Sequence, residues 1–152
     1  MLLGYLDYFR SVVLDKLDGL SEADLRSSRL PSGWTPLELL KHLSYVERRW
    51  LVWGFLGQKV ADRWGDSRDG RWWVDPVETL SELTRELTDQ AAVTQSIVEG
   101  HDLGEVGQPG ERWDGAPPAT LERILLHLLQ EYARHAGHLD IVRELVDGRV
   151  GE

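Results

Sequence analysis

Two stretches dominate this chain: Leu37-Glu38-Leu39-Leu40-Lys41-His42, and His127-Leu128-Leu129-Gln130-Glu131-Tyr132-Ala133-Arg134-His135-Ala136-Gly137-His138. In the second, the polar positions 127, 131, 135 and 138 are spaced at helical intervals. At about 100° per residue, their side chains share an arc of roughly 80° on one helical face. Leucines lie beside that face, so it borders a packed interior, where polar groups without partners are costly. The two stretches therefore look like two halves of one metal site.

The composition predicts one acidic domain covering residues 1–152, because a chain of 152 residues can bury most of its unfolded surface and is too short to suggest two domains. Its 26 acidic and 17 basic residues give a formal charge of -9, and the basic residues are scattered. This distribution argues against nucleic acid as a partner. Cysteine is absent, so any thiol chemistry must use a thiol from solution.

The N-terminus predicts a cytoplasmic protein. Met1-Leu2-Leu3-Gly4-Tyr5-Leu6-Asp7 has no basic region and no small-residue cleavage site of the secretory kind. The longest apolar runs are interrupted by charge far short of the ~18 residues that a membrane span needs. We therefore expect a soluble protein without a membrane partner.

Hydrophobic spacing and capping signals predict four helices. The second and third helices are expected to open with capping boxes, Thr35-Pro36-Leu37-Glu38 and Asp75-Pro76-Val77-Glu78. The expected ranges are 2–17, 35–57, 75–100 and 120–147.

These helices indicate an all-α four-helix bundle, since no segment alternates with a period of two for long enough to demand a strand. The linker from Gln58 to Val74 is long enough to return along a whole helix and start the next one parallel to it. We expect a crossover connection that places the second and third helices parallel.

The metal geometry limits which ligands can act together. His127 and His135 would lie about 12 Å apart along one helix, too far to share an ion through bonds of about 2 Å. Glu131 with His135, His127 with Glu131, or His135 with His138 could each chelate, and His42 on the second helix would supply the third donor. If the second and fourth helices are antiparallel, His135 or His138 is favoured as the partner of His42 in the metal site. A simple up-down-up-down bundle would favour His127 instead.

Nearly the whole chain resembles the DinB-like superfamily of metal-binding four-helix bundles. It is most similar to the actinobacterial branch related to mycothiol-dependent enzymes, which includes maleylpyruvate isomerase and mycothiol S-transferase. The resemblance rests on Trp34-Thr35-Pro36-Leu37-Glu38-Leu39-Leu40-Lys41-His42-Leu43 with Glu47, Arg48 and Trp50, and on Glu131-Tyr132-Ala133-Arg134-His135-Ala136-Gly137-His138-Leu139-Asp140 with Arg143 and Glu144.

The resemblance implies that His42, Glu131 and His135 are the metal ligands and that the second and third helices are parallel. Many relatives have histidine at the position of Glu131, and the carboxylate here resembles the arrangement in mycothiol-dependent maleylpyruvate isomerase. Nitrogen and oxygen donors suit zinc best here, with nickel, iron or manganese as alternatives.

The resulting hypothesis is a divalent-metal-dependent thiol S-transferase. A low-molecular-weight thiol, by resemblance mycothiol, would become a metal-bound thiolate and attack a small electrophile, for example in detoxification. The alternatives are a non-catalytic, stress-related metal-binding protein of the same fold, and a purely structural helical dimer. A homodimer is compatible with each of these.

Structural explanations for the same residues stay open. A single histidine on an apolar face is more often a hydrogen-bonded core residue, and Glu131 could form an ordinary ion pair with Arg134 or Lys41. His101 falls in a loop. The aromatic and basic residues of the two long linkers could wall a substrate pocket or seal the ends of the bundle. These residues are Trp64, Trp72, Trp73, Trp113, Arg63, Arg68, Arg71 and Arg112.

Overall fold

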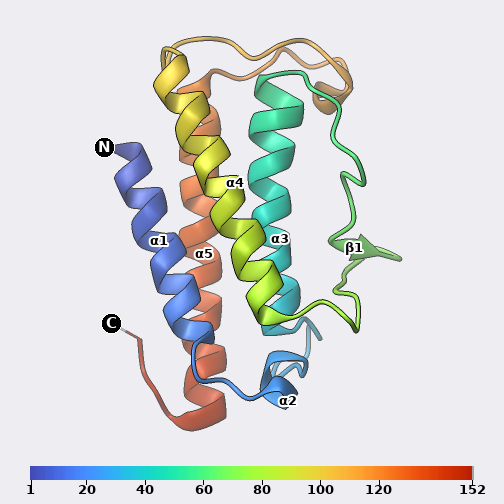
Figure 1. Cartoon of the computed structure of the whole chain (residues 1–152), viewed down its shortest axis with the longest axis vertical. Helices are drawn as coiled ribbons and strands as arrows, with labels where there is room; N and C mark the ends of the chain where they lie inside the picture. Colours follow the sequence, from blue (N-terminus) through green and yellow to red (C-terminus); the bar gives the residue numbers. More distant parts are fainter. Residues whose placement is uncertain (152) are drawn as a thin grey trace.

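A computed structural model describes residues 1–151, and helices account for most of them. The four long ones form a bundle (Figure 1). They are α1 (Leu2–Leu17), α3 (Pro36–Arg48) with its π-helical continuation η1 (Arg49–Phe55), α4 (Leu80–Gly100) and α5 (Leu121–Asp147). The short elements are α2 (Glu22–Leu25), β1 (Ser67–Arg68), β2 (Arg71–Trp72) and the 3-10 turn η2 (Glu111–Trp113). The all-α four-helix bundle is confirmed.

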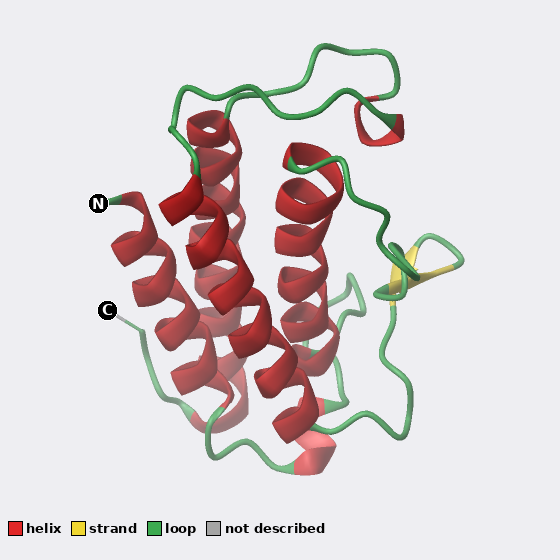
Figure 2. Ribbon diagram, turned by 45° about the horizontal axis from the view of Figure 1, so that its top comes forward, coloured by secondary structure: helices red, strands yellow, loops and turns green. Residues whose placement is uncertain are grey.

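The long helices run in two directions. In Figure 1, α1 and α5 run downward, whereas α3 and α4 run upward, so α3 and α4 are parallel. The chain between them passes beside α3, where it forms the small β1–β2 hairpin (Figure 2). The predicted crossover is thereby confirmed. Because α3 and α5 are antiparallel, the start of α3 lies level with the C-terminal half of α5.

Local capping explains where α3 and α5 begin and where α5 ends. The Thr35 hydroxyl accepts a hydrogen bond from the Glu38 backbone N–H, while the Glu38 carboxylate accepts one from the Thr35 N–H at 2.8 Å. The Thr120 hydroxyl accepts the Arg123 N–H in the same way. Gly148, with φ of 77°, closes α5 in the left-handed region that glycine tolerates. The boundaries predicted from these residues are confirmed.

The predicted start of the third helix was wrong. The Glu78 carboxylate accepts the Asp75 backbone N–H at 2.6 Å, but it also binds the Lys41 ammonium of α3 at 2.8 Å. The segment 75–78 forms a turn fixed to α3, and α4 starts only after Thr79. Thr79 and Glu82 make the capping box that the helix uses.

A buried carboxylate ties the four long helices together. Glu47 of α3 accepts hydrogen bonds from Arg10 of α1 at 2.9 and 2.8 Å, and from the hydroxyls of Thr94 of α4, at 2.6 Å, and Tyr132 of α5. Glu47, Thr94 and Tyr132 are fully buried. Because a buried charge without partners is costly, these bonds fix the helices in one register. The hydrophobic core of the bundle is rich in leucine and includes Leu6, Leu17, Leu37, Leu39, Leu40, Leu43, Leu83, Leu87, Leu125 and Leu128.

The β1–β2 hairpin was not predicted. Its turn residues Asp69 and Gly70 have φ values of 51° and 74°, which is the backbone of a tight two-residue hairpin turn. Ser67 pairs with Trp72 across the hairpin. Asp66 directly precedes β1, and the Trp73 backbone N–H donates to its carbonyl at 2.8 Å. The hairpin therefore holds residue 66 opposite residue 73, which directly follows Trp72, and β2 packs against α3.

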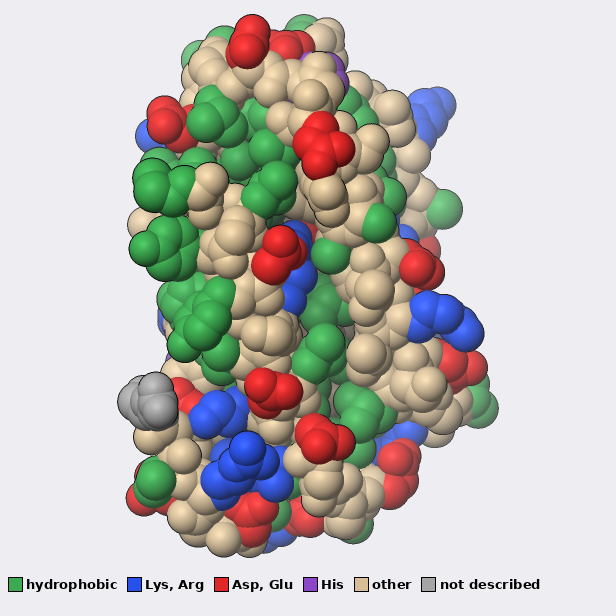
Figure 3. Space-filling view, turned by 60° about the vertical axis from the view of Figure 1, so that its left-hand side comes forward, with side chains coloured by type: hydrophobic (Ala, Val, Ile, Leu, Met, Phe, Trp, Pro, Cys, Tyr) green, Lys and Arg blue, Asp and Glu red, His purple; other side chains and the backbone are tan. Residues whose placement is uncertain are grey.

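Charges of both signs share the surface. On the face shown in Figure 3, basic side chains lie beside acidic ones, and hydrophobic side chains gather along one edge. Within residues 1–151, no helix combines the length and the apolar character that a membrane crossing requires.

The position of the α4 cap can be tested with Thr79→Ala. This change removes a hydroxyl that accepts the Glu82 backbone N–H, so we expect the free energy of unfolding to fall by about 1 kcal/mol in urea titrations. The control Ser81→Ala changes an exposed residue in the first turn and should cause no loss. A larger loss for Asp75→Ala than for Thr79→Ala would contradict the assigned helix start.

The buried cluster predicts a large effect of Arg10→Met. The variant leaves the Glu47 carboxylate without its cationic partner, and the free energy of unfolding should fall by about 3–5 kcal/mol. Asp7→Asn is the matched control, because Asp7 is the exposed partner of Arg10 and should contribute less than about 1 kcal/mol. Adding Glu47→Gln to Arg10→Met should restore part of the loss. Equal losses in Arg10→Met and Asp7→Asn would exclude the role given to Glu47.

Candidate metal centre

Three side chains converge between α3 and α5. His42 of α3 and Glu131 and His135 of α5 each offer one ligand atom, and these atoms lie within 4.8 Å of one another. The Glu131 Oε2 atom is 3.3 Å from His135 Nε2 and 3.8 Å from His42 Nε2. His135 is buried, and the other two are partly exposed. The structure thus places together the three residues that were predicted as ligands.

The remaining histidines lie outside this trio. His127 Nε2 is 3.7 Å from the other carboxylate oxygen of Glu131, and His138 Nδ1 is 3.2 Å from His135 Nδ1. His101 lies past the end of α4 and pairs with Glu105. Of the pairs left open by spacing, the antiparallel arrangement of α3 and α5 therefore brings Glu131 and His135 to His42.

The ordinary ion pairs considered for Glu131 do not form. Lys41 binds Glu78 instead, and its ammonium lies over the Trp73 ring, 4.6 Å from the centroid. Within residues 1–151, the basic side chains at ion-pair distance from Glu131 are the imidazoles of His42, His127 and His135. The carboxylate faces imidazoles rather than a lysine or an arginine.

A second carboxylate orients the His42 ring. Asp66, which is 1% exposed, accepts a hydrogen bond from His42 Nδ1 at 3.0 Å and is held by Arg49 at 2.6 and 3.0 Å. Because a carboxylate only accepts, a hydrogen resides on Nδ1, and Nε2 faces Glu131 and His135. A histidine fixed by a carboxylate in this way is typical of metal ligands. Sequence reasoning missed Asp66: Asp69-Gly70 carried a signal for the hairpin, but not for its contact with α3.

The charges of the site reinforce one another. Burial disfavours the protonated form of His42, but the hydrogen bond to Asp66 and the nearby Glu131 carboxylate outweigh it and raise the His42 pKa. The neighbouring imidazoles of His135 and His42 hold the Glu131 pKa far below its usual range. Burial would raise the pKa of Asp66, but His42 and Arg49 lower it overall. Both carboxyl groups are therefore ionised at neutral pH and favour a cation between the helices.

Aromatic rings enclose the site on one side. Trp72 of the hairpin stacks on the His42 ring at 4.2 Å between centroids and meets the His135 ring edge-on at 5.2 Å. Trp34, just before α3, lies 5.9 Å from the His138 ring. The hairpin that supplies Asp66 thus also supplies a wall.

The other linker residues mostly pack against one another. Arg68 lies over Trp73, Arg112 over Trp50, and Arg63 binds Glu111. Of the aromatic linker residues, Trp72 alone has a described aromatic contact with a member of the trio. Trp72 therefore lies against the candidate metal site, whereas the other linker residues contact neighbours away from it. Trp64 packs edge-on against Trp53, and Trp113 against Trp50.

The donor set fits a divalent cation. Two imidazole nitrogens and one carboxylate oxygen, with an outer carboxylate behind His42, are what zinc and related ions use in open sites. Structural zinc sites usually have four protein ligands, whereas this cluster offers three.

This combination of fold and cluster defines the class, a DinB-like four-helix bundle with a histidine–glutamate–histidine group between its second and last long helices. The model of the mycothiol S-transferase family matches residues 1–148. The chain belongs to this family. A comparison with curated proteins finds no match.

The outer carboxylate predicts a measurable effect on metal binding. Asp66→Asn weakens the hold on the His42 ring, so we expect the affinity for Zn²⁺ to fall by about 10- to 100-fold in a competition titration with a chelating dye. Asp69→Asn is the matched control, since Asp69 is exposed in the same hairpin and asparagine tolerates its positive φ. Equal affinities in the two variants would contradict the role of Asp66.

Proposed function

We propose that the protein is a divalent-metal-dependent S-transferase that joins a low-molecular-weight thiol, mycothiol, to a small electrophile. The observation that carries this proposal is the convergence of His42, Glu131 and His135 in a chain of the mycothiol S-transferase family. A detoxifying role and a cytoplasmic location agree with this chemistry. A homodimer stays a prediction.

His42, Glu131 and His135 would hold the cation, for which zinc is the first choice and nickel, iron and manganese are alternatives. When bound, such a cation lowers the pKa of a coordinated thiol and so supplies a thiolate at neutral pH. Two neutral imidazoles and one carboxylate leave the site with a net positive charge, which favours an anionic sulfur.

The chain's own residues orient the reactants and limit side reactions. Asp66 holds the His42 ring in one tautomer, and the Trp72 ring covers its face. In the transfer, the thiol loses its proton to solvent, the sulfur electron pair forms the S–C bond, and the leaving group departs with the electron pair of the broken bond. Because the chain has no cysteine, the electrophile meets no competing protein thiol.

The proposal predicts that the metal and the activity depend on the same residues. Protein purified without chelators should contain about one divalent cation per chain and should conjugate mycothiol to a fluorogenic chloromethyl bimane. His42→Ala and His135→Ala should lose both the cation and at least about 100-fold in rate, because two donors hold a cation much more weakly than three.

The matched control is His101→Ala, which removes a histidine that lies outside the trio and pairs with Glu105. It should keep the metal content and the rate. Metal content unchanged in His42→Ala and His135→Ala would exclude these ligands. A metal-loaded protein that conjugates no thiol would instead support a non-catalytic metal-binding protein.

A further inference from the structure

Two clefts of similar size flank the trio. The first, of about 300 Å³, is called the Trp34–Trp72 cleft here and contacts the site through Trp72, which stacks on His42. The second, of about 320 Å³, is called the Trp50–His127 cleft and contacts it through His127, whose Nε2 is 3.7 Å from Glu131. A transfer between two small molecules needs two binding regions that meet at the reacting atoms.

The clefts lie at opposite ends of the trio. Glu38 lines the first and Trp50 the second, and both belong to the continuous helical segment α3–η1. From position 38 to position 50, a helix rises roughly 18 Å. His42 lies between Glu38 and Trp50 on this segment. On the antiparallel α5, His127 lies toward the second cleft and His138, beside Trp34, toward the first. Molecules in the two clefts would therefore approach the trio from opposite directions.

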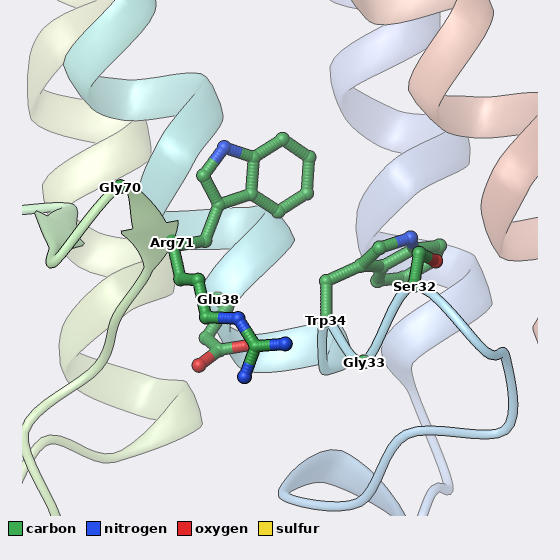
Figure 4. A pocket seen from close by; sticks show the side chains of 7 residues that line it. Ser32, Gly33, Trp34, Glu38, Gly70 and Arg71 are labelled. Carbon is green, nitrogen blue, oxygen red and sulfur yellow. The ribbon is translucent and has the colours of Figure 1, made fainter.

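The Trp34–Trp72 cleft combines aromatic faces with polar groups. Figure 4 shows Arg71 and Glu38 on one side of it and Trp34 and Ser32 on the other. The Arg71 side chain is exposed, so its guanidinium is open to a ligand at the edge of the cleft. An indole ring packs against C–H faces, while guanidinium, carboxylate and hydroxyl groups bond to hydroxyls that both donate and accept. This combination suits a polyol.

The Trp50–His127 cleft has a more apolar wall. Ile124 is buried in its floor, and Leu126 and the Trp50 ring line it. Such a cleft suits an apolar group better than a polyol.

We infer that the Trp34–Trp72 cleft binds the polyol part of the thiol and that the Trp50–His127 cleft binds the electrophile, with the trio between them. This inference rests on the proposed transfer reaction. Mycothiol carries its cysteine-derived thiol on a glucosamine–inositol unit, which offers the C–H faces and hydroxyls that the first cleft matches. Arg71 is the specificity-determining residue for this unit.

Two matched pairs of variants test the assignment. Arg71→Ala should raise the KM for mycothiol by about tenfold or more, the cost of a hydrogen bond to a charged group, and leave the KM for the bimane unchanged. Its control is Arg68→Ala, because Arg68 faces Arg71 across the hairpin but lies over Trp73. Leu126→Ser should raise only the KM for the bimane, by roughly fivefold. Its control is Ile141→Ser, an exposed residue of α5 outside both clefts.

A binding measurement separates this inference from the proposed function. Glucosaminyl inositol, the sulfur-free part of mycothiol, should bind the wild-type protein and the Arg68→Ala variant, and bind Arg71→Ala at least about tenfold more weakly in calorimetric titrations. If this pattern appeared without any thiol transfer by the wild-type protein, the polyol site would stand and the transferase would fail. If the wild-type protein turned over normally while Arg71→Ala and Arg68→Ala had equal KM values and affinities, the inference would be overturned.

Discussion

The Glu47 carboxylate sets the positions on which the site depends. It is buried among the four long helices and binds one side chain from each of the other three. A charge in that environment is stable only when its partners are in place, so sliding or rotating one helix breaks hydrogen bonds that water cannot replace. Tyr132 directly follows Glu131, and its bond to Glu47 therefore fixes the rotation of α5 that turns Glu131 and His135 toward His42. Leucine packing alone would tolerate more variation in register.

The site itself is built in two layers of different origin. The three candidate ligands come from long helices, which hold side chains in place well. The groups behind and beside them come from the crossover, where the Asp69–Gly70 turn places Asp66 and Trp72 on opposite arms of one hairpin. Asp66 fixes the His42 tautomer, and Arg49 in turn fixes Asp66. The contacts between Arg49 and Asp66 and between Asp66 and His42 are charge-assisted hydrogen bonds in a buried setting, where such bonds are strong.

The sequence was sufficient for those features that depend on periodicity and on local capping. The bundle, the parallel second and third helices, and the grouping of His42, Glu131 and His135 followed from spacing, linker length and family resemblance. Two features depend on contacts between distant residues and were missed. The Asp75-Pro76-Val77-Glu78 motif was read as a cap, but Lys41 on another helix holds its glutamate, and α4 starts at the next capping box. Asp66 lies 24 residues from His42, and no periodic pattern in a loop reports which helix it will touch.

The candidate ligands lie on long helices, whereas some of the groups that wall the site lie on loops. This difference has a consequence for how proteins of this fold can diversify. Substitutions at the hairpin or near the start of α5 would reshape each cleft, while the inner leucines and the Glu47 cluster keep His42, Glu131 and His135 together. Relatives could thus change which molecules each cleft admits by substitutions at a few surface positions, at little cost in folding stability.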